Sequence, residues 1–146
     1  MSWYYNNKEL TDEEIPNNAV GFIYLIENLT KKELNKEPYL YIGKKSMISE
    51  RTKKLGKRAI ANLTDKRSSK KVKTITESNW REYNGSNKEL LEDIKSGNLV
   101  NKYILEFCFS KTQLTYLETK HLFCSNVLED ARYYNSNILG KFYKTI

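Results

Sequence analysis

Hydrophobic residues gather in three short stretches that are rich in β-forming side chains. Residues 20–27 read Val-Gly-Phe-Ile-Tyr-Leu-Ile-Glu, a run too short for a buried helix, and they predict a strand. A second strand is predicted over residues 39–43 and a third over residues 103–109. The polar stretch 28–38 joins the first two strands, which predicts an antiparallel hairpin with a long connection.

Capping signals predict two helices. Ser86 and Glu89 form a Ser-x-x-Glu capping box, and the helix that they open is expected to stop at Gly97. Ser110 begins a second capping box with a glutamine three positions on, which predicts a helix to about residue 125.

The second of these helices places a carboxylate at the border of its apolar face. Its apolar positions are Leu114, Leu117, His121, Cys124 and Leu128. At about 100° per residue, Glu118 lies beside this stripe and not opposite to it. A carboxylate in that place must be paired, hydrogen-bonded or bound to a cation. From helical geometry alone, an ion pair at the rim with a lysine such as Lys120 or Lys102 is the favoured interpretation.

The remaining segments lack a clear apolar pattern. Residues 1–18 predict an irregular N-terminal arm with at most one helical turn, which ends before Pro16. Residues 46–62 predict a basic helix and residues 63–76 a basic loop. The elements together predict one domain over residues 1–146, of the α/β class, in which helices flank a small, mainly antiparallel, three-stranded β-sheet.

The composition suits one globular domain and disfavours several classes of protein. The 146 residues are 39% hydrophobic and 12% aromatic, enough for a core without disulfides. No apolar run approaches the roughly 20 residues of a membrane helix, and acidic side chains stand where a signal peptide would need apolar ones. We therefore expect a cytoplasmic protein without a membrane partner. Cys108, Cys124 and His121 are too few for a zinc site, and both cysteines are expected to be buried.

The net charge of +7 is concentrated in one segment. Residues 44–73 contain 12 basic and 2 acidic side chains, whereas residues 1–43 carry a net charge of −3 and residues 74–146 carry none. Such a segment attracts a polyanion, because each Lys or Arg that neutralises a phosphate releases counterions. A solvated loop kept for solubility is the simpler alternative. The candidate DNA contacts are Lys45, Lys53, Lys54, Lys57, Arg58, Lys66, Arg67, Lys70, Lys71 and Lys73.

The first two predicted strands carry short motifs of aromatic residues and glycine. With three later residues, the motif positions in chain order are Gly21, Tyr24, Tyr41, Gly43, Arg51, Glu118 and Asn135. This combination resembles the GIY-YIG nuclease superfamily over residues 21–135. Residues 79–86 resemble a segment of its phage-encoded members, which include homing-endonuclease-like proteins.

The resemblance implies a role for the motif residues in phosphodiester hydrolysis. Glu118 would hold one divalent ion, Mg²⁺ or Mn²⁺, and Arg51 would stabilise the phosphate. Tyr24 would activate water, and its phenol pKa of about 10 would first have to be lowered by a cation such as Lys44. Tyr41 would orient the phosphate or the water.

Each of these roles has a simpler alternative. The two tyrosines would otherwise be ordinary strand aromatics, Lys44 a surface lysine that follows the phosphates, and Asn135 a turn residue instead of a catalytic one. Trp80 and Tyr83 could stack on nucleic acid, but aromatics near a helix start are more often in the core, which is favoured for Trp80. His121, one turn after the glutamate, is more simply a core histidine than a neighbour of a metal-bound water.

These observations predict a metal-dependent endonuclease that hydrolyses double-stranded DNA. Homing-type specificity for a long site would need a partner or a homodimer, so a compact phage nuclease of limited sequence specificity, acting in the host cytoplasm, is favoured. The alternatives are a non-catalytic nucleic-acid-binding module that uses residues 44–73 and a structural protein that holds a nucleic acid or an acidic partner. The enzyme would be favoured over both alternatives if the two tyrosines, the arginine and the glutamate lay around one point.

Overall fold

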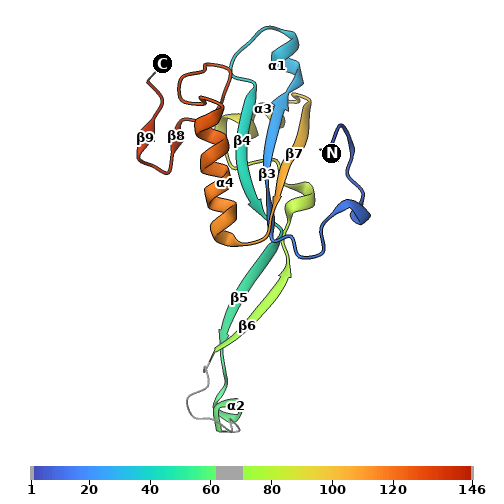
Figure 1. Ribbon diagram of the computed structural model, residues 1–146, viewed down its shortest axis with the longest axis vertical. Helices are drawn as coiled ribbons and strands as arrows, with labels where there is room; N and C mark the ends of the chain where they lie inside the picture. Colours follow the sequence, from blue (N-terminus) through green and yellow to red (C-terminus); the bar gives the residue numbers. More distant parts are fainter. Residues whose placement is uncertain (1, 62–70, 146) are drawn as a thin grey trace.

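The computed structural model describes residues 2–61 and 71–145, and its centre is a five-stranded mixed β-sheet (Figure 1). The strand order is β2-β1-β7-β3-β4. In chain order the elements are β1 (Trp3–Tyr5), β2 (Lys8–Glu9), η1 (Asp12–Glu14), β3 (Gly21–Asn28), α1 (Leu29–Glu33), β4 (Leu40–Ser46), β5 (Ile48–Lys54), α2 (Lys57–Ala61), β6 (Lys71–Glu77), η2 (Trp80–Glu82), α3 (Lys88–Lys95), β7 (Val100–Cys108), α4 (Lys111–Cys124), β8 (Asn137–Ile138) and β9 (Phe142–Tyr143). The pairs β5-β6 and β8-β9 form separate two-stranded sheets.

The three predicted strands form the antiparallel centre of the sheet. β3 pairs with β4 on one side and with β7 on the other, both in antiparallel orientation, which confirms the predicted hairpin. β7 begins earlier than predicted, because its inward-facing positions already start at Val100. The connection between β3 and β4 also contains the short helix α1, which Asn28 caps.

The predicted three-stranded sheet is wrong because the N-terminal arm joins it. β1 pairs in parallel with β7, with Trp3 opposite Lys102, and β2 adds an outer antiparallel strand. Trp3 is 3% exposed, and its Nε1 donates a hydrogen bond to the carbonyl of Trp80 at 2.9 Å. Burial of this large ring anchors a segment that has no periodic pattern of its own. The single turn before Pro16 is confirmed as η1.

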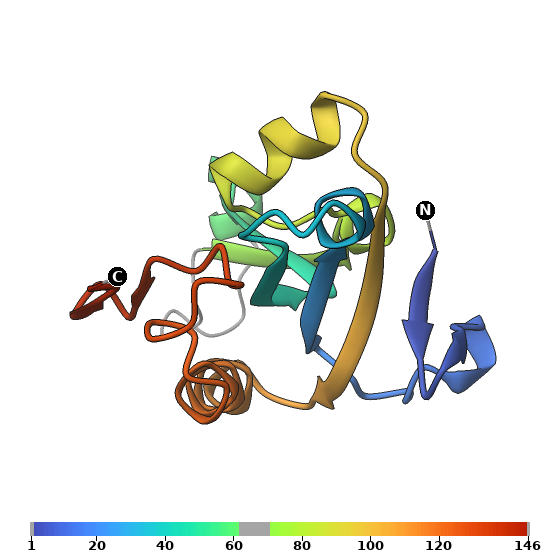
Figure 2. The ribbon, with the colours of Figure 1, turned by 90° about the horizontal axis from the view of Figure 1, so that it is seen from above.

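Apolar side chains cover both faces of the sheet. Along β3, Phe22, Tyr24 and Ile26 belong to one hydrophobic cluster. Ile23 belongs to the other, because successive side chains of a strand point to opposite faces. The first cluster contains Trp80, which is 3% exposed, so the core interpretation of this residue is confirmed. α4 lies on one side of the sheet and α3 on the other (Figure 2).

The predicted N-cap is confirmed for α4, whereas the N-cap of α3 lies one residue after the predicted one. Ser110 accepts a hydrogen bond from the backbone N–H of Gln113 at 3.0 Å, as predicted. The N-cap of α3 is Asn87 and not Ser86. Gly97 follows α3 with a φ of +101°, a conformation that favours glycine. None of the helices in the described ranges has the length and apolarity to cross a membrane.

The buried stripe of α4 rotates toward the end of the helix. The first two predicted leucines are buried, but Leu122 and not His121 or Cys124 continues the core. A stripe with three- and four-residue spacing drifts around a helix that turns by about 100° per residue. The predicted core position of His121 is therefore wrong, and its Nε2 lies 3.0 Å from Glu106 Oε2 at the rim. Cys108 is buried as predicted, whereas Cys124 is exposed.

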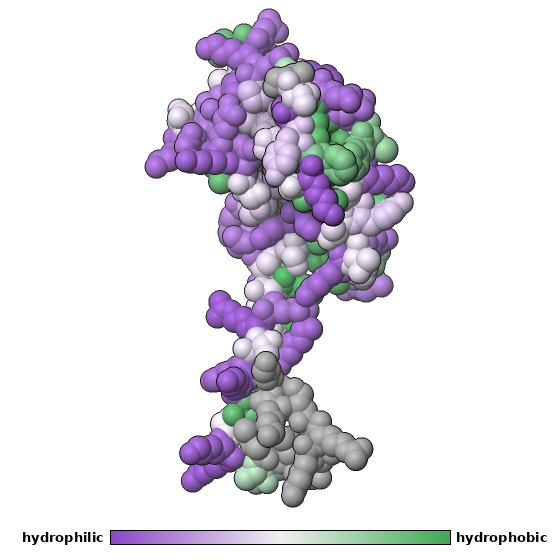
Figure 3. Space-filling view, turned by 90° about the vertical axis from the view of Figure 1, so that its left-hand side faces the viewer, coloured by the Kyte–Doolittle hydropathy of each residue, from purple (hydrophilic) through white to green (hydrophobic). Residues whose placement is uncertain are grey.

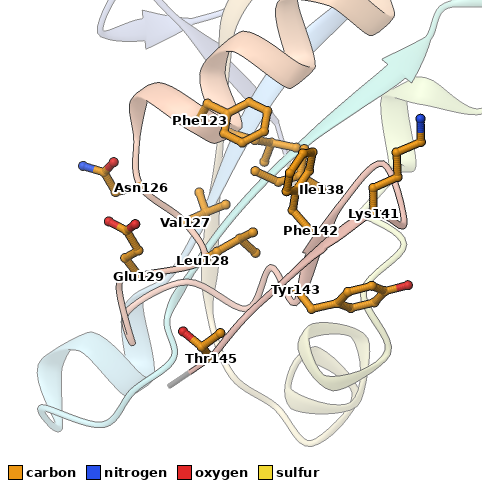
Figure 4. A pocket seen from close by; sticks show the side chains of 11 residues that line it. Phe123, Asn126, Val127, Leu128, Glu129, Ile138, Lys141, Phe142, Tyr143 and Thr145 are labelled. Atoms are coloured by element: carbon orange, nitrogen blue, oxygen red, sulfur yellow. The ribbon is translucent and has the colours of Figure 1, made fainter.

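The C-terminal hairpin β8-β9 lies against the end of α4 and borders an open pocket of about 440 Å³ (Figure 4). Phe123 and Phe142 meet edge to face there, with ring centroids 5.5 Å apart. None of the predicted site residues is among the described residues that line this pocket. The predicted chemistry therefore belongs to another part of the fold.

β5, β6 and α2 form an arm that extends away from the central sheet (Figure 1). We use this name for the described residues 48–61 and 71–77. The helix predicted over residues 46–62 is confirmed only at α2, because residues 48–54 form β5 instead. The predicted loop is wrong over residues 71–76, which belong to β6. β6 contains Val72 and the consecutive residues Thr74, Ile75 and Thr76 between charged ends, and such β-branched side chains favour a ribbon. Residues 63–70 of the predicted loop lie outside the described residues.

Candidate active site

The outer edge of β4 is covered at one end. Leu40 and Ile42 direct their N–H groups away from β3: Leu40 donates to the carbonyl of Arg132 at 2.8 Å, and Ile42 donates to Asn135 Oδ1 at 3.1 Å. Asn135 Nδ2 returns a hydrogen bond to the carbonyl of Ile42 at 2.8 Å. Since alternate residues of a strand point the same way, the next outward N–H is that of Lys44.

Asn135 acts as a clamp on this edge. Its side chain is buried, and both of its polar atoms bind the backbone of Ile42. The neighbouring Tyr134 is fixed in turn, since its hydroxyl donates to Asp93 Oδ2 at 2.6 Å and accepts from Asn28 Nδ2 at 3.1 Å. Asn135 is thus more than a turn residue, because it holds the strand that carries the second motif.

Glu118 meets Lys44 at the uncovered end of β4. The half-buried carboxylate accepts a hydrogen bond from the Lys44 backbone, and the Lys44 Nζ donates to Thr115 Oγ1 at 2.9 Å, one turn earlier on α4. Burial raises the pKa of Glu118, while the charge and the backbone hydrogen bond of Lys44 oppose that rise. The predicted ion pair with Lys120 or Lys102 is wrong: no ion pair within the described part of the chain includes Glu118.

Tyr24 reaches the same edge from the opposite face of the sheet. It lies directly opposite Gly43 in the antiparallel register and is 1% exposed. A Cβ at Gly43 would come within 2.6 Å of the Tyr24 Cζ and closer still to its hydroxyl. The glycine of the second motif is therefore needed to let the phenol of the first motif lie across β4.

Two more tyrosines surround this phenol. The ring centroid of Tyr24 is 6.1 Å from that of Tyr41 and 6.0 Å from that of Tyr83. The Tyr41 hydroxyl lies 3.2 Å from Ser86 Oγ, and the Lys45 Nζ lies 4.2 Å from the centroid of the Tyr83 ring. Sequence reasoning missed Ser86 as a site residue because it assigned this serine to a helix cap.

Burial raises the pKa of both Tyr24 and Tyr41 above the usual value for a phenol. For Tyr24, the nearby phenols of Tyr41 and Tyr83 and the carboxylate of Glu118 raise the pKa further. Tyr83 and Glu118 also raise the pKa of Tyr41, which a hydrogen bond from Ser86 partly opposes. The expected lowering of the Tyr24 pKa by a lysine is wrong for this structure, so both phenols are neutral at neutral pH.

The loop that carries Tyr83 is held from below by a buried lysine. Lys102 is 1% exposed, and its Nζ donates to the carbonyl of Tyr83 at 2.9 Å and to that of Arg81 at 3.4 Å. The charge lies 4.5 Å from the ring centroid of Trp3, and burial lowers the pKa of Lys102 to about 8. The sequence could have predicted this burial, because Lys102 lies between Val100 and Ile104 in the alternation of the strand and therefore faces the core.

Tyr24, Tyr41, Lys44 and Glu118 meet at this edge, and we call them the cluster. Arg51 does not belong to it. It lies exposed on β5, opposite Thr74, and not on the helix predicted over residues 46–62. At about 3.3 Å per extended residue, the seven steps along the chain from Lys44 to Arg51 span up to about 23 Å. The structure thus brings Tyr24, Tyr41, Lys44 and Glu118 together and leaves the predicted arginine on the arm.

The predicted DNA contacts are divided between the cluster and the arm. Lys45 lies beside Tyr83 and donates to Asn79 Oδ1 at 2.7 Å. The exposed arm residues among them are Lys53, Lys54, Lys57, Arg58 and Lys73, and Lys71 is the first residue of β6. The remaining three, Lys66, Arg67 and Lys70, lie outside the described residues.

The donors at the edge of β4 suit a hard cation. Glu118 is half-buried with only partial compensation from Lys44, so a divalent ion would offset an existing desolvation cost. Within residues 2–61 and 71–145, no group of three or more His, Cys, Asp or Glu residues could hold a metal. One carboxylate supplemented by water is an arrangement that Mg²⁺ accepts, so the predicted ligand fits the ion.

The fold and the edge cluster define a class of small α/β domain in which two strand motifs and a helix-borne glutamate meet at one sheet edge. The family model described as "Putative endonuclease segE, GIY-YIG domain" matches residues 3–138. The chain belongs to this family, which confirms the resemblance in the sequence. Neither the curated proteins nor the solved structures contain a significant match to the chain.

Proposed function

We propose that this protein is an endonuclease that hydrolyses phosphodiester bonds of double-stranded DNA with the help of one divalent metal ion. The observation that carries the proposal is the meeting of Tyr24, Tyr41 and Glu118 around the end of β4 that carries Lys44. Family membership supports nuclease activity and a DNA substrate in general terms. The cluster adds a hard anion, a cation and oriented hydroxyls, which phosphodiester hydrolysis needs.

Glu118 and Lys44 form the charged half of the proposed site. Glu118 would hold Mg²⁺ or Mn²⁺, which supplies charge neutralisation and a more acidic water when bound. Lys44 lies close enough to Glu118 to oppose the rise in the pKa of Glu118 that burial causes, so its ammonium group can attract a phosphate to the same place. The hydrogen bond to Thr115 holds this ammonium group over α4.

Tyr24 and Tyr41 form the uncharged half. Because their pKa values are raised, each presents an O–H group that can donate to one oxygen and accept from another. We assign to Tyr24 the orientation of the attacking water and to Tyr41 a hydrogen bond to the phosphate. Ser86 fixes the direction of the Tyr41 hydroxyl. Tyr24 is thus a positioning hydroxyl and not a phenolate base.

The arm supplies the remaining positive charge. The family pattern gives Arg51 a role at the cleaved phosphate, whereas its place on β5 suits a contact further along the same duplex. Contacts of this kind to phosphates carry little sequence information, so we propose limited sequence specificity. A long recognition site would need a second copy of the chain or another partner. Phage origin remains a prediction from the resemblance.

Cleavage of a supercoiled plasmid tests the proposal. The purified protein should convert the plasmid to nicked or linear forms with Mg²⁺ or Mn²⁺ and should not do so with EDTA. A Glu118→Gln preparation purified in parallel controls for a contaminating nuclease. Absence of cleavage with both ions, in a protein that is folded and binds DNA, would contradict the proposal.

A non-catalytic DNA-binding module is the second candidate. The distance of the basic arm from the tyrosine cluster favours it, because binding by the arm does not require the cluster. In that case the parent and the Glu118→Gln variant would bind DNA alike, and neither would cleave it.

A further inference from the structure

Within the described residues, the arm is a ribbon that no other layer of the molecule covers. Residues 51–54 and 72–77 are all exposed, and Figure 3 shows the arm as a largely hydrophilic projection below the body of the molecule. The described arm residues include seven Lys or Arg and two Glu. A two-stranded ribbon gains little stability from itself, so its exposure and charge favour an anionic partner.

The two faces of the ribbon differ in charge. Residues that lie directly opposite each other in an antiparallel pair share a face. One face, which we call the Arg51 face, consists of the pairs Ser49–Thr76, Arg51–Thr74 and Lys53–Val72. No carboxylate belongs to these three pairs. The opposite face carries Glu50, which accepts a hydrogen bond from Lys111 of α4 at 2.8 Å and lies 3.2 Å from the Nζ of Lys73. The Arg51 face is therefore turned away from α4.

Hydrogen bonds fix the base of the arm to the sheet. Ser78 Oγ donates to the carbonyl of Ser46 at 2.6 Å, and the Ser78 N–H donates to the carbonyl of Met47 at 3.0 Å. Met47 is buried and donates its own N–H to the carbonyl of Val20 at 2.8 Å. β5 thus continues from β4 through an anchored residue, and a partner held by the arm lies next to the strand that carries the cluster.

We propose that the arm enters the major groove of a B-form DNA duplex with the Arg51 face toward the base edges. The proposal rests on the DNA substrate of the proposed function, but not on hydrolysis. Strands of a ribbon lie about 4.8 Å apart, so a ribbon with its side chains fits a major groove about 12 Å wide and not a minor groove of about 6 Å.

The side chains of this face suit the groove. Arginine can bind the guanine edge, threonine hydroxyls can bond to any base, and the Val72 methyl groups can contact those of thymine. Lys54, on the opposite face near the end of β5, would reach a flanking phosphate. This placement also accounts for the position of Arg51 away from the tyrosine cluster.

Binding to matched duplexes tests the proposal. The probes are a 20-bp DNA duplex, the same duplex with bulky 5-substituents on its pyrimidines, which fill only the major groove, and double-stranded RNA of the same sequence. With Ca²⁺ and no Mg²⁺ or Mn²⁺, fluorescence anisotropy should give about tenfold weaker binding to the substituted DNA and to the RNA, whose major groove is deep and narrow.

The double variant Arg51→Ala/Lys53→Ala should lose about tenfold in affinity for plain DNA and little for the substituted DNA. The matched control is Lys88→Ala/Lys95→Ala on α3, which removes two exposed lysines away from the arm.

Equal parental affinity for plain and substituted DNA would overturn the groove proposal and would indicate that the arm follows the phosphate backbone. Equal affinity for RNA would overturn it as well. If plasmid cleavage persists in either case, the proposed function stands while the groove proposal falls. If the parent discriminates among the three duplexes but never cleaves plasmid, the groove proposal stands and the proposed function falls.

Discussion

The central sheet and the arm are positioned by opposite means. In the sheet, the Tyr24 ring occupies the space that a side chain at Gly43 would need, and it is almost fully buried. In the arm, no atom of the described chain lies within 4 Å of a Cβ placed on Gly56. Packing therefore fixes the cluster, whereas a backbone ladder and a few hydrogen bonds at its base fix the arm.

This difference implies that substitutions in the two regions have different consequences. A change in the sheet should reduce stability or the rate of cleavage, because the site depends on close packing. A change on the arm should reduce affinity and leave folding intact, because exposed positions contribute little to stability.

Among changes to the uncharged half of the proposed site, Tyr24→Phe should produce the largest effect on the cleavage rate. It keeps the ring but removes the hydroxyl, and loss of one preorganised hydrogen-bonding group typically lowers a rate by about 10²–10³. The melting temperature should stay near that of the parent. Because the Tyr24 pKa is raised, the parent's rate should show no inflection from this phenol below about pH 10. Tyr116→Phe, on an exposed tyrosine of α4, is the matched control. A parental rate in Tyr24→Phe would reduce Tyr24 to a packing residue.

The same substitution, glycine to alanine, can be made in both regions, and its effect on stability can be compared between Gly43 in the sheet and Gly56 in the arm. The first adds a methyl group against the Tyr24 phenol and should lower the free energy of unfolding by about 1–3 kcal/mol. The second adds a methyl group on the arm where no described atom is near, and should change stability little. Urea denaturation measures both. Equal stabilities of the two variants would show that the close approach at Gly43 is not required.

Lys102→Met should change how stability depends on pH. Burial lowers the folded-state pKa of Lys102 to about 8, whereas an unfolded lysine titrates near pH 10.4. Between these values the unfolded chain binds the proton and the folded chain does not, so this lysine makes stability rise with pH. From pH 7 to pH 10, the parent should gain on the order of 2 kcal/mol relative to the variant. A constant difference between parent and variant would mean that Lys102 is not desolvated. Lys88→Met is the exposed control.

Arg51→Ala should produce the smallest effect, and it tests whether this residue acts in DNA binding or in the cleavage step. As an arm residue, Arg51 should affect affinity by about tenfold and leave the cleavage rate at saturating DNA unchanged. As the catalytic arginine of the family pattern, it should instead lower that saturated rate by about 10²–10³. Single-turnover kinetics over a range of DNA concentrations separates the two. A lost rate at saturation would mean that the arm bends toward the cluster when DNA binds.

The central strands and the caps of α4 could be predicted because their signals are local. Residues 20–27 carry a dense β-forming run, and Ser110 lies within three residues of the N–H that it caps. Part of the cluster followed from the motifs, because register places Tyr24 opposite Gly43. The half-buried position of Glu118 at the border of the apolar face of α4 also followed, since it depends only on the turn of one helix. Its meeting with the Lys44 end of β4 did not follow, because it depends on how α4 packs against the sheet.

The rest depends on contacts between distant residues. β1 pairs with β7 through Trp3 and Lys102, which no periodic pattern in the N-terminal segment reveals. The arm was predicted as a helix and a loop because its lysines suit a helix as well as a strand, and only pairing between β5 and β6 decides. That error carried over to Arg51, which was expected on a helix and lies on a strand.

The most direct test of the central claim is the cleavage rate of Glu118→Gln at saturating DNA with Mg²⁺. The claim is that hydrolysis occurs at the edge of β4, where Glu118 meets Lys44 and the tyrosines. The rate should fall below detection, while DNA affinity stays the same or rises because one negative charge is removed. Glu33→Gln, an exposed glutamate on α1, should cleave like the parent. Full metal-dependent cleavage by folded Glu118→Gln would contradict the account.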